Sequence, residues 1–326
     1  MLHKIFVAGL LSLAAITVAK ANDQIIYQLG WLPSGANAAV YVGLYEGLFK
    51  KAGLDVEVRT GRGSTDALTR VATGTADFGE VSLSTLLVAK AEGSIAATAI
   101  MPLYTRPPDT LLTIAGGKIS KLADVVGKKI ATSPYSSSNI MWPLVLRANG
   151  IDPAKVPLTQ VDAATFNGLL ATGQVDGLIT WVTNTGDAAI ALEEQGKKLK
   201  PINWSTFGYE GYSQTLVASA DAVKKKADAY ARFLKAYRDA EISMNSDPSK
   251  AARSFSAIVP GENLKSLEMD IRATAGLMFN DITERDGLGR FNPDLVKVTW
   301  KWVAESQKIP LDKIDPTSVI DGSLAK

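Results

Sequence analysis

Short apolar stretches alternate with helical patterns along most of this chain, and the alternation starts a second time near the middle. Residues 25–30 (IIYQLG) and 54–59 (LDVEVR) are expected to form strands, and the apolar segment 38–49 between them a buried helix. Further strands are expected at 128–133 and 174–181. Strands that alternate with helices favour a largely parallel sheet between layers of helices. The sequence therefore predicts an α/β protein.

A local repeat indicates that this α/β chain has two similar halves. ATGTADFG at 72–79 is matched by ATGQVDGL at 171–178, in each case a helix end, a Thr-Gly stop and the start of a strand. The 326 residues also exceed the usual size of one core. We expect two similar doubly wound lobes joined by a short hinge. Lobe I should contain residues 22–115 and 213–326, and lobe II residues 116–212.

The first residues have the pattern of a secretory signal. Lys4 precedes an apolar run, and the small residues of Ala19-Lys20-Ala21 follow it. The run is too short for a membrane span, which argues against a retained anchor. We therefore expect a signal peptide at 1–21 that is cleaved after Ala21, and a protein exported to the periplasm.

Composition excludes several kinds of chemistry. The chain has no Cys, and its one His is His3, inside the expected signal. Disulfides, thiolate chemistry, Ser-His-Asp catalysis and His-ligated zinc are thereby excluded from the exported part. Loss of Lys4 and Lys20 would leave 33 basic (35 − 2) against 33 acidic residues, a balance that gives no reason to expect nucleic acid. We expect no cofactor, no metal and no catalytic residues.

Several segments in a fixed order resemble a known family. They are YQLGWLPSGANAAVYVGLYEGLFKKAGLDVEV at 27–58, GRGSTDALTRVATGTADFGEVS at 61–82, TLLTIAGG at 110–117 and GQVDGLITW at 173–181. In these the chain is similar to solute-binding proteins of ABC importers, in the NMT1/THI5-like branch near the SsuA and nitrate/taurine binders. The resemblance implies a type II-like periplasmic binding protein, with a ligand cleft between two lobes that close by a hinge.

The same family includes yeast pyrimidine synthases, whose branch needs an active-site His and a Cys-rich motif. This chain has neither outside its first residues. The resemblance therefore implies binding and delivery of a solute, with an inner-membrane ABC permease as partner.

The stretch GRGS at 61–64 follows an expected strand and opens a helix. Its GxG invites a dinucleotide-binding interpretation, but the third Gly of that motif is missing. In a doubly wound sheet, loops at the carboxyl ends of strands face the ligand. We expect Gly61 and Gly63 to let the backbone approach the cleft, Ser64 to cap the helix, and Arg62 to be a candidate anion contact. A plain turn with a cap is the alternative.

Further candidates follow other strands of lobe I. Trp31 would offer a flat face to a planar ligand, and Asn37 a donor and an acceptor. Glu80 would favour an amine, an amidine or an aminopyrimidine, with Ser82 beside it. Ordinary packing, helix capping and stabilisation by a helix dipole are the alternatives for these residues. Arg106 is expected to pair with Asp109 rather than with a ligand.

Lobe II contributes a polar segment and a second aromatic residue. SPYSSSN at 133–139 follows a strand and has more hydroxyls than helix capping needs. Trp181 could close on the other face of a ligand ring, and two Tyr lie near the second crossing between the lobes. The ligand-binding candidates of this half are Ser133, Tyr135, Ser136, Ser137, Ser138, Trp181, Thr183, Asn184, Tyr209 and Tyr212.

Two Trp with hydroxyls and amides favour a small planar polar ligand, of the pyrimidine or thiamine-precursor type. We expect a monomer that works by closing over its ligand, without chemistry. An anionic solute such as an alkylsulfonate, an aromatic acid or nitrate is the first alternative, because Arg62 follows a strand that faces the cleft. A pyrimidine-forming enzyme and a sensory module that docks to a membrane receptor are the others.

Overall fold

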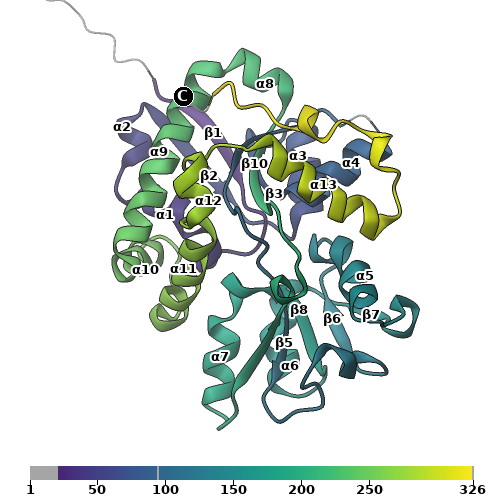
Figure 1. Cartoon of the computed structure of the whole chain (residues 1–326). Coiled ribbons are helices and arrows are strands. Elements are labelled where there is room, and N and C mark those ends of the chain that lie inside the picture. The colour runs from purple at the N-terminus through teal and green to yellow at the C-terminus, as the bar shows by residue number, and fades with distance from the viewer. Residues whose placement is uncertain (1–20, 94, 325–326) are drawn as a thin grey trace, which may run out of the picture.

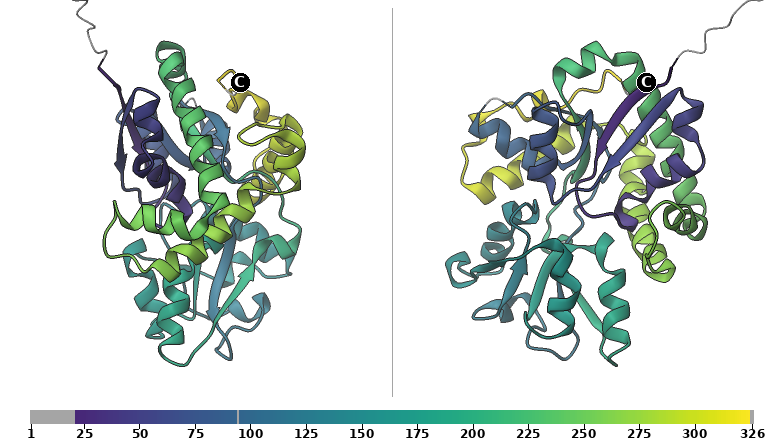
Figure 2. Two further views of the ribbon diagram at one scale, coloured as in Figure 1. Left: turned by 90° about the vertical axis from the view of Figure 1, so that its left-hand side faces the viewer. Right: turned by 180° about the vertical axis from the view of Figure 1, so that it is seen from behind.

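The structure is a computed structural model that describes residues 21–93 and 95–324. The expected signal peptide lies, apart from Ala21, outside these residues. The chain forms two lobes, one above the other in Figure 1, each with its own β-sheet. The side and rear views of Figure 2 show the same division. In the described ranges, no helix is both long and apolar enough to cross a membrane.

The sheet of lobe I has five strands. Their order across the sheet is β2 (Leu54–Arg59), β1 (Asp23–Gln28), β3 (Phe78–Ser82), β10 (Gln214–Ala218) and β4 (Thr98–Pro102). The first three are parallel, and β10 runs antiparallel to both of its neighbours. The strand that returns from lobe II thus lies in the interior of the sheet.

The sheet of lobe II repeats this arrangement. Its order is β7 (Leu158–Gln160), β6 (Ile130–Thr132), β8 (Gly177–Trp181), β5 (Asp109–Ile114) and β9 (Leu199–Asn203). Strands β6, β7 and β8 are parallel, and β5 is antiparallel to β8 and β9. The expected pair of similar α/β lobes is confirmed, with one antiparallel crossing strand in each otherwise parallel group.

The first crossing between the lobes comes earlier than predicted. Residues 109–114 were assigned to lobe I, but they form β5 in the sheet of lobe II, so the chain crosses between Pro102 and Asp109. The apolar run TLLTI fits the interior of either sheet, and sequence pattern does not say which sheet a buried strand joins. The second crossing lies between 208 and 213, next to the predicted lobe boundary at residues 212 and 213.

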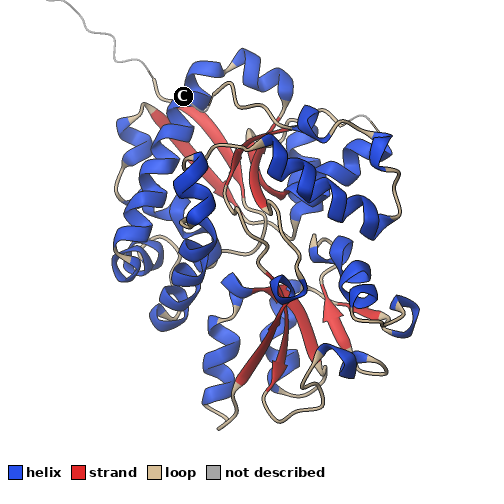
Figure 3. Cartoon of the chain, in the orientation of Figure 1, coloured by secondary structure: helices blue, strands red, loops and turns tan. Residues whose placement is uncertain are grey.

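Helices cover the strands of both lobes (Figure 3). Those between strands are α1 (Ala38–Tyr45), α2 (Leu48–Lys51), α3 (Ser64–Ala72), α4 (Leu83–Glu92), α5 (Ser138–Ala148), α6 (Phe166–Ala171) and α7 (Gly186–Glu193). After β10 come α8 (Ala220–Lys225), α9 (Ala227–Ser246), α10 (Pro248–Ser256), α11 (Leu264–Met278), α12 (Asp281–Asp286) and α13 (Pro293–Gln307). Short 3-10 turns, including η1 (Gly35–Asn37) and η5 (Val182–Asn184), lie near the junction of the lobes.

Two of the C-terminal helices reach across to lobe II. On one side α13 packs against α5, where Ser306 Oγ donates a hydrogen bond to the Ile140 carbonyl (2.5 Å). On the other side α11 contacts both α7 and η5. One apolar core is continuous across the α13 side and includes the contact of Trp142 with Trp204, whose ring centroids are 5.4 Å apart. The two lobes are therefore joined by packed helices as well as by the crossing strands.

Candidate functional site

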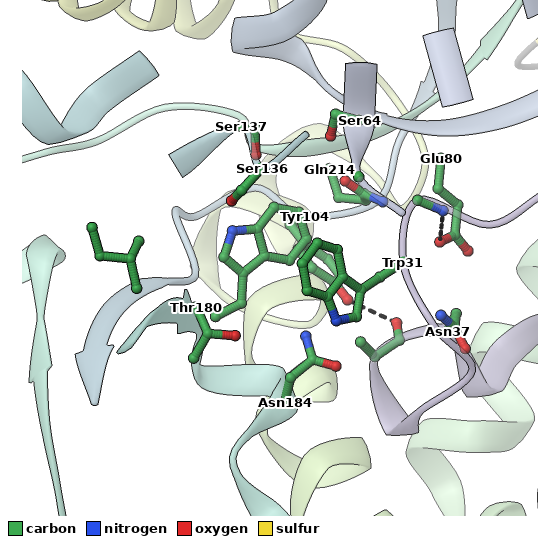
Figure 4. Close-up of a pocket in the computed structure, with 15 residues that line it drawn as sticks. Trp31, Asn37, Ser64, Glu80, Tyr104, Ser136, Ser137, Thr180, Asn184 and Gln214 are labelled. Atoms are coloured by element: carbon green, nitrogen blue, oxygen red, sulfur yellow. Dashed lines mark hydrogen bonds between the residues drawn. The ribbon is translucent and has the colours of Figure 1, made fainter. Parts of the chain in front are cut away.

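A cavity lies between the two lobes, next to the strand ends that meet there. Residues of β3, β8 and β10 line it, together with the loop after β1 and the start of α3. Figure 4 shows side chains of both lobes pointing into this space. The cavity is the place where the topology brings the candidate residues together. Eight of them line it: Trp31, Asn37, Ser64, Glu80, Ser136, Ser137, Trp181 and Asn184.

Eight other candidates do not line the cavity. Tyr209 and Tyr212 are buried under α13, where Tyr209 packs on Trp302 and the Tyr212 hydroxyl accepts from the backbone N–H of Asn292 (2.8 Å). Helix α13 covers the second crossing, which the sequence could not show. Ser82, Ser138 and Thr183 are buried behind the lining residues. Arg62, Ser133 and Tyr135 lie in a neighbouring groove instead.

Sequence reasoning missed three polar residues of the lining: Tyr104, Thr180 and Gln214. Each lies at or near the end of a strand, of β4, β8 and β10 respectively. Tyr104 and Gln214 lie at the two crossings between the lobes. This position was the feature of the sequence that could have identified them as lining residues. The Tyr104 hydroxyl donates to the carbonyl of Ala36, another residue of the lining (2.8 Å).

Glu80 supplies the one carboxylate of the lining. Its Oε1 accepts from the Tyr27 hydroxyl (2.8 Å), which is also 3.1 Å from the hydroxyl of Tyr237. Its Oε2 accepts from the backbone N–H of Gly30 (3.1 Å). Burial raises the pKa of Glu80 to about 7, although these hydrogen bonds and one from Gln214 oppose the rise. The carboxyl group can therefore gain or lose its proton near neutral pH.

Gln214, the first residue of β10, lies beside Glu80. Its side-chain amide donates to the Glu80 carboxyl group, which fixes the amide orientation. Its Oε1 is buried and accepts no hydrogen bond within the described parts of the chain. A buried acceptor without a donor costs free energy unless a ligand or water satisfies it. Figure 4 shows Gln214 close to Ser64 at the edge of the cavity.

The two Trp of the lining come from different lobes. Trp31 belongs to lobe I and reaches Phe166 of lobe II, with ring centroids 5.9 Å apart. Trp181 ends β8 of lobe II and meets Tyr104 edge-on, with centroids 5.9 Å apart and planes at 62°. Both indoles are only partly buried. They provide aromatic surface on both sides of the junction between the lobes.

The role expected for Ser64 as a helix cap was wrong. Gly63 is the N-cap residue of α3, and Ser64 is its first helical residue. The Ser64 oxygen accepts from the backbone N–H of Ser82 (3.0 Å), which links α3 to the end of β3. Gly63 has φ +146°, a conformation that L side chains rarely adopt, and this places the helix start one residue earlier than the Ser pattern suggested.

The lining contains an acidic side chain but no basic one. Its fifteen residues include the carboxyl group of Glu80 and no Lys, Arg or His. Across the described ranges, no cluster of three His, Cys, Asp or Glu could hold a metal ion. The cavity has a volume of about 40 Å³, far below the several hundred Å³ usual for a ligand site. The lobes are in contact next to it, where the Ser34 hydroxyl donates to Asn184 Oδ1 of lobe II (2.6 Å).

The two Arg considered for an anionic ligand lie elsewhere. Arg62 is exposed in the neighbouring groove, with its guanidinium 4.5 Å from the centre of the Tyr135 ring. Arg106 forms an exposed ion pair with Asp281 of α12, not with Asp109 as expected. The partner lies far along the sequence, so local spacing could not identify it.

Two lobes of one topology with a polar, aromatic cavity between them define the class: the chain has the fold of the periplasmic binding proteins. The alkanesulfonate-binding protein SsuA of Xanthomonas axonopodis pv. citri, solved with MOPS, superposes with a TM-score of 0.71 at 15% identity, over 93% of this chain and 98% of that one. The periplasmic aliphatic sulphonate binding protein SsuA of Escherichia coli gives 0.69 at 14%, over 93% and 92%.

Within that class, the chain belongs to the NMT1/THI5-like family, whose model matches residues 36–251. A "Putative thiamine biosynthesis protein" of Haemophilus influenzae is 27% identical over 74% of this chain and 76% of its own. A "Formylaminopyrimidine-binding protein" of Halalkalibacterium halodurans is 20% identical over 67% and 65%. A yeast protein named as a 4-amino-5-hydroxymethyl-2-methylpyrimidine phosphate synthase (Saccharomyces cerevisiae) is 27% identical, but over only 34% and 32%.

Proposed function

We propose that this protein is the periplasmic solute-binding component of an ABC importer. It captures a small planar polar molecule, of the pyrimidine or thiamine-precursor type, between its lobes and delivers it to an inner-membrane permease. It acts as a monomer and carries out no chemistry on the ligand. The names of the Haemophilus and Halalkalibacterium relatives support the ligand class, and the SsuA neighbours support the role in import.

The observation that carries the ligand class is the pairing of Glu80 with Gln214. Glu80 is a buried carboxyl group, and Gln214 Oε1 is a buried acceptor that receives no hydrogen bond from residues 21–93 and 95–324. Together they favour a ligand that donates N–H groups, as an amino-substituted heterocycle does. The absence of Lys, Arg and His from the lining disfavours an anion in this cavity. Trp31 and Trp181 would contact the faces of the ring.

The proposed mechanism is a shift between open and closed states. The cavity is small in the closed form, so the ligand enters when the lobes part and is enclosed when they meet. Trp31 and Glu80 of lobe I and Trp181 and Asn184 of lobe II would bind the same molecule. Because these contacts need both lobes, the ligand stabilises the closed form.

A ligand screen tests the proposal. The purified protein is heated with pyrimidines, thiamine precursors, aromatic acids, alkylsulfonates and nitrate, and tryptophan fluorescence is followed in parallel titrations. A ligand at about 100 times its dissociation constant adds ~2.7 kcal/mol to the free energy of unfolding and raises Tm by several degrees. We expect this for an aminopyrimidine, with unchanged ligand recovered afterwards. Stabilisation by anions alone, or conversion of the ligand to a product, would contradict the proposal.

Variants locate the binding site. Trp31→Phe and Trp181→Phe should each remove part of the ligand-dependent fluorescence change and weaken binding. Trp302→Phe is the matched control, because Trp302 packs on Tyr209 outside the cavity. Equal effects of all three substitutions would place the ligand somewhere else.

A further inference from the structure

A buried carboxyl group lies where the chain first enters lobe II. Asp109 is the first residue of β5, and only 5% of it is exposed. It forms no ion pair with a described Lys or Arg, and the Arg106 expected to pair with it binds Asp281 instead. A buried carboxyl group without a cation is costly, so its hydrogen bonds need an explanation.

Those hydrogen bonds lead to the wall of the cavity. Ser138 is completely buried at the start of α5, and its hydroxyl donates to Asp109 Oδ1 (2.6 Å). The same Ser138 oxygen accepts from the indole N–H of Trp181 (3.2 Å). A hydroxyl has one proton to donate, and Ser138 donates it in the hydrogen bond to the Asp109 carboxyl group. The oxygen lone pairs are therefore left to face the indole.

The strand register reinforces this chain of hydrogen bonds. Asp109 lies directly opposite Trp181 in the antiparallel pair of β5 with β8. The next residue, Val182, donates its backbone N–H to the Pro108 carbonyl (2.9 Å). Backbone and side chain thus attach Trp181 to the same point, the entry of the first crossing into lobe II.

The indole also contacts an aromatic neighbour that is itself held in place. Tyr104 packs edge-on against it, and the Tyr104 hydroxyl is held by the Ala36 carbonyl (2.8 Å). The Trp181 ring is therefore fixed by a hydrogen bond at its nitrogen and by an aromatic contact. An exposed indole without that hydrogen bond could turn about its side-chain torsions.

We propose that Asp109 and Ser138 are positioning residues that orient the Trp181 indole as a wall of the ligand cavity. Ser138 was selected from the sequence as a ligand contact, but the structure places it behind the ring, where it acts on the ligand through Trp181. This inference rests on the proposed binding function only for its effect on affinity. The orientation of the ring can be measured without any ligand.

The first test observes the indole itself. In a ¹H–¹⁵N spectrum of the protein, Trp181→Phe identifies the indole N–H signal of Trp181. Ser138→Ala should shift this signal and speed its exchange with solvent by more than tenfold, because the acceptor has been removed. Asp109→Ala should act in the same direction. Ser254→Ala removes another buried hydroxyl, in α10 of lobe I, and should leave the signal unchanged. An unshifted Trp181 signal in Ser138→Ala would overturn the proposal.

The second test uses the aminopyrimidine found to bind. Ser138→Ala should weaken its binding by about tenfold, the usual effect of one lost hydrogen bond. In a Trp181→Phe background, which keeps an aromatic ring but has no N–H, Ser138→Ala should have no further effect. Additive losses would mean that Ser138 acts independently of Trp181, and would also overturn the proposal. If no ligand binds at all, the proposed function fails, while the indole signal still decides the positioning role.

Discussion

Gly63 of lobe I lies directly against the backbone of Tyr135 of lobe II. A Cβ built on Gly63 would be 2.2 Å from the Tyr135 carbonyl oxygen, closer than any such contact in real proteins. Nearby, the Ser34 hydroxyl donates to Asn184 Oδ1 of lobe II (2.6 Å). The second Gly of the GRGS stretch therefore lets the two loops meet, because only a residue without a side chain fits against the Tyr135 backbone.

Gly63→Ala should hold the lobes apart. The added methyl group cannot coexist with the Tyr135 backbone, so the closed form becomes less populated and the ligand binds more weakly, by tenfold or more. Small-angle X-ray scattering with saturating ligand should give a larger radius of gyration than for the unsubstituted protein.

Gly74→Ala is the matched control for backbone strain. Gly74 follows the other end of α3 and also has a positive φ (+73°), and no described residue lies within 4 Å of a Cβ built on it. This variant should lose about 1 kcal/mol of stability or somewhat more but keep its affinity. Equal losses of affinity in the two variants would show that strain, not contact between the lobes, causes the effect.

Asp270 of α11 should stabilise the closed form from the other side. Its Oδ1 accepts from the backbone N–H groups of Thr185 (2.9 Å) and Gly186 (3.0 Å) at the start of α7 in lobe II. Asp270→Ala leaves both donors unsatisfied, so we expect faster hydrogen exchange at these two residues and about tenfold weaker ligand binding. Asp270→Asn keeps an acceptor oxygen, so it should restore most of the protection from hydrogen exchange and most of the affinity for the ligand. Failure of Asn to restore them would show that the charge matters more than the hydrogen bonds.

Stability should rise as the pH falls from 8 to about 5. Burial raises the pKa of Glu80 to about 7, above its ordinary value of 4.5. A carboxyl group with a raised pKa makes its full contribution to the stability of the folded state when the pH is below its ordinary pKa. It loses this contribution as the pH rises through its raised pKa, here about 7. For Glu80 alone the change is roughly 3 kcal/mol. Burial also raises the pKa of Asp109 to about 6 and that of Asp270 to about 7, with the same sign.

Urea unfolding between pH 5 and 8 measures this dependence. Glu80→Gln cannot ionise at that position, so its free energy of unfolding should change less with pH than that of the unsubstituted protein. A pH dependence identical in both, or a stability that increases towards pH 8, would contradict the assignment of the raised pKa to Glu80.

Arg62→Ala distinguishes the two ligand classes. Arg62 lies outside the cavity, over the Tyr135 ring, so its removal should change the affinity for an aminopyrimidine less than threefold. An exposed cation–π contact contributes only about 0.5–1 kcal/mol. Isothermal titration calorimetry gives the affinity directly. If the variant loses affinity for an alkylsulfonate that binds the unsubstituted protein, the groove beside Tyr135 is an anion site and the ligand class must be revised.

The sequence by itself determined the elements and their repetition. Hydrophobic periodicity and the repeated Thr-Gly stops predicted two α/β lobes, because these signals depend on neighbours within a few residues. Position at the carboxyl ends of strands was enough to select Trp31, Glu80 and Trp181 as candidates. The absence of Cys, and of His after His3, limited the possible chemistry through composition alone.

Only the tertiary structure decided which polar groups meet. Gln214 joins Glu80 because β10 returns between β3 and β4, and Tyr212 leaves the site because α13 covers it. Strand register places Asp109 opposite Trp181, and the start of α5 brings Ser138 into contact with both. Sheet order, helix coverage and hydrogen bonds between distant residues depend on packing of the whole chain. No local pattern contains that information, so the lobes could be predicted from the sequence, but the arrangement of the cavity could not.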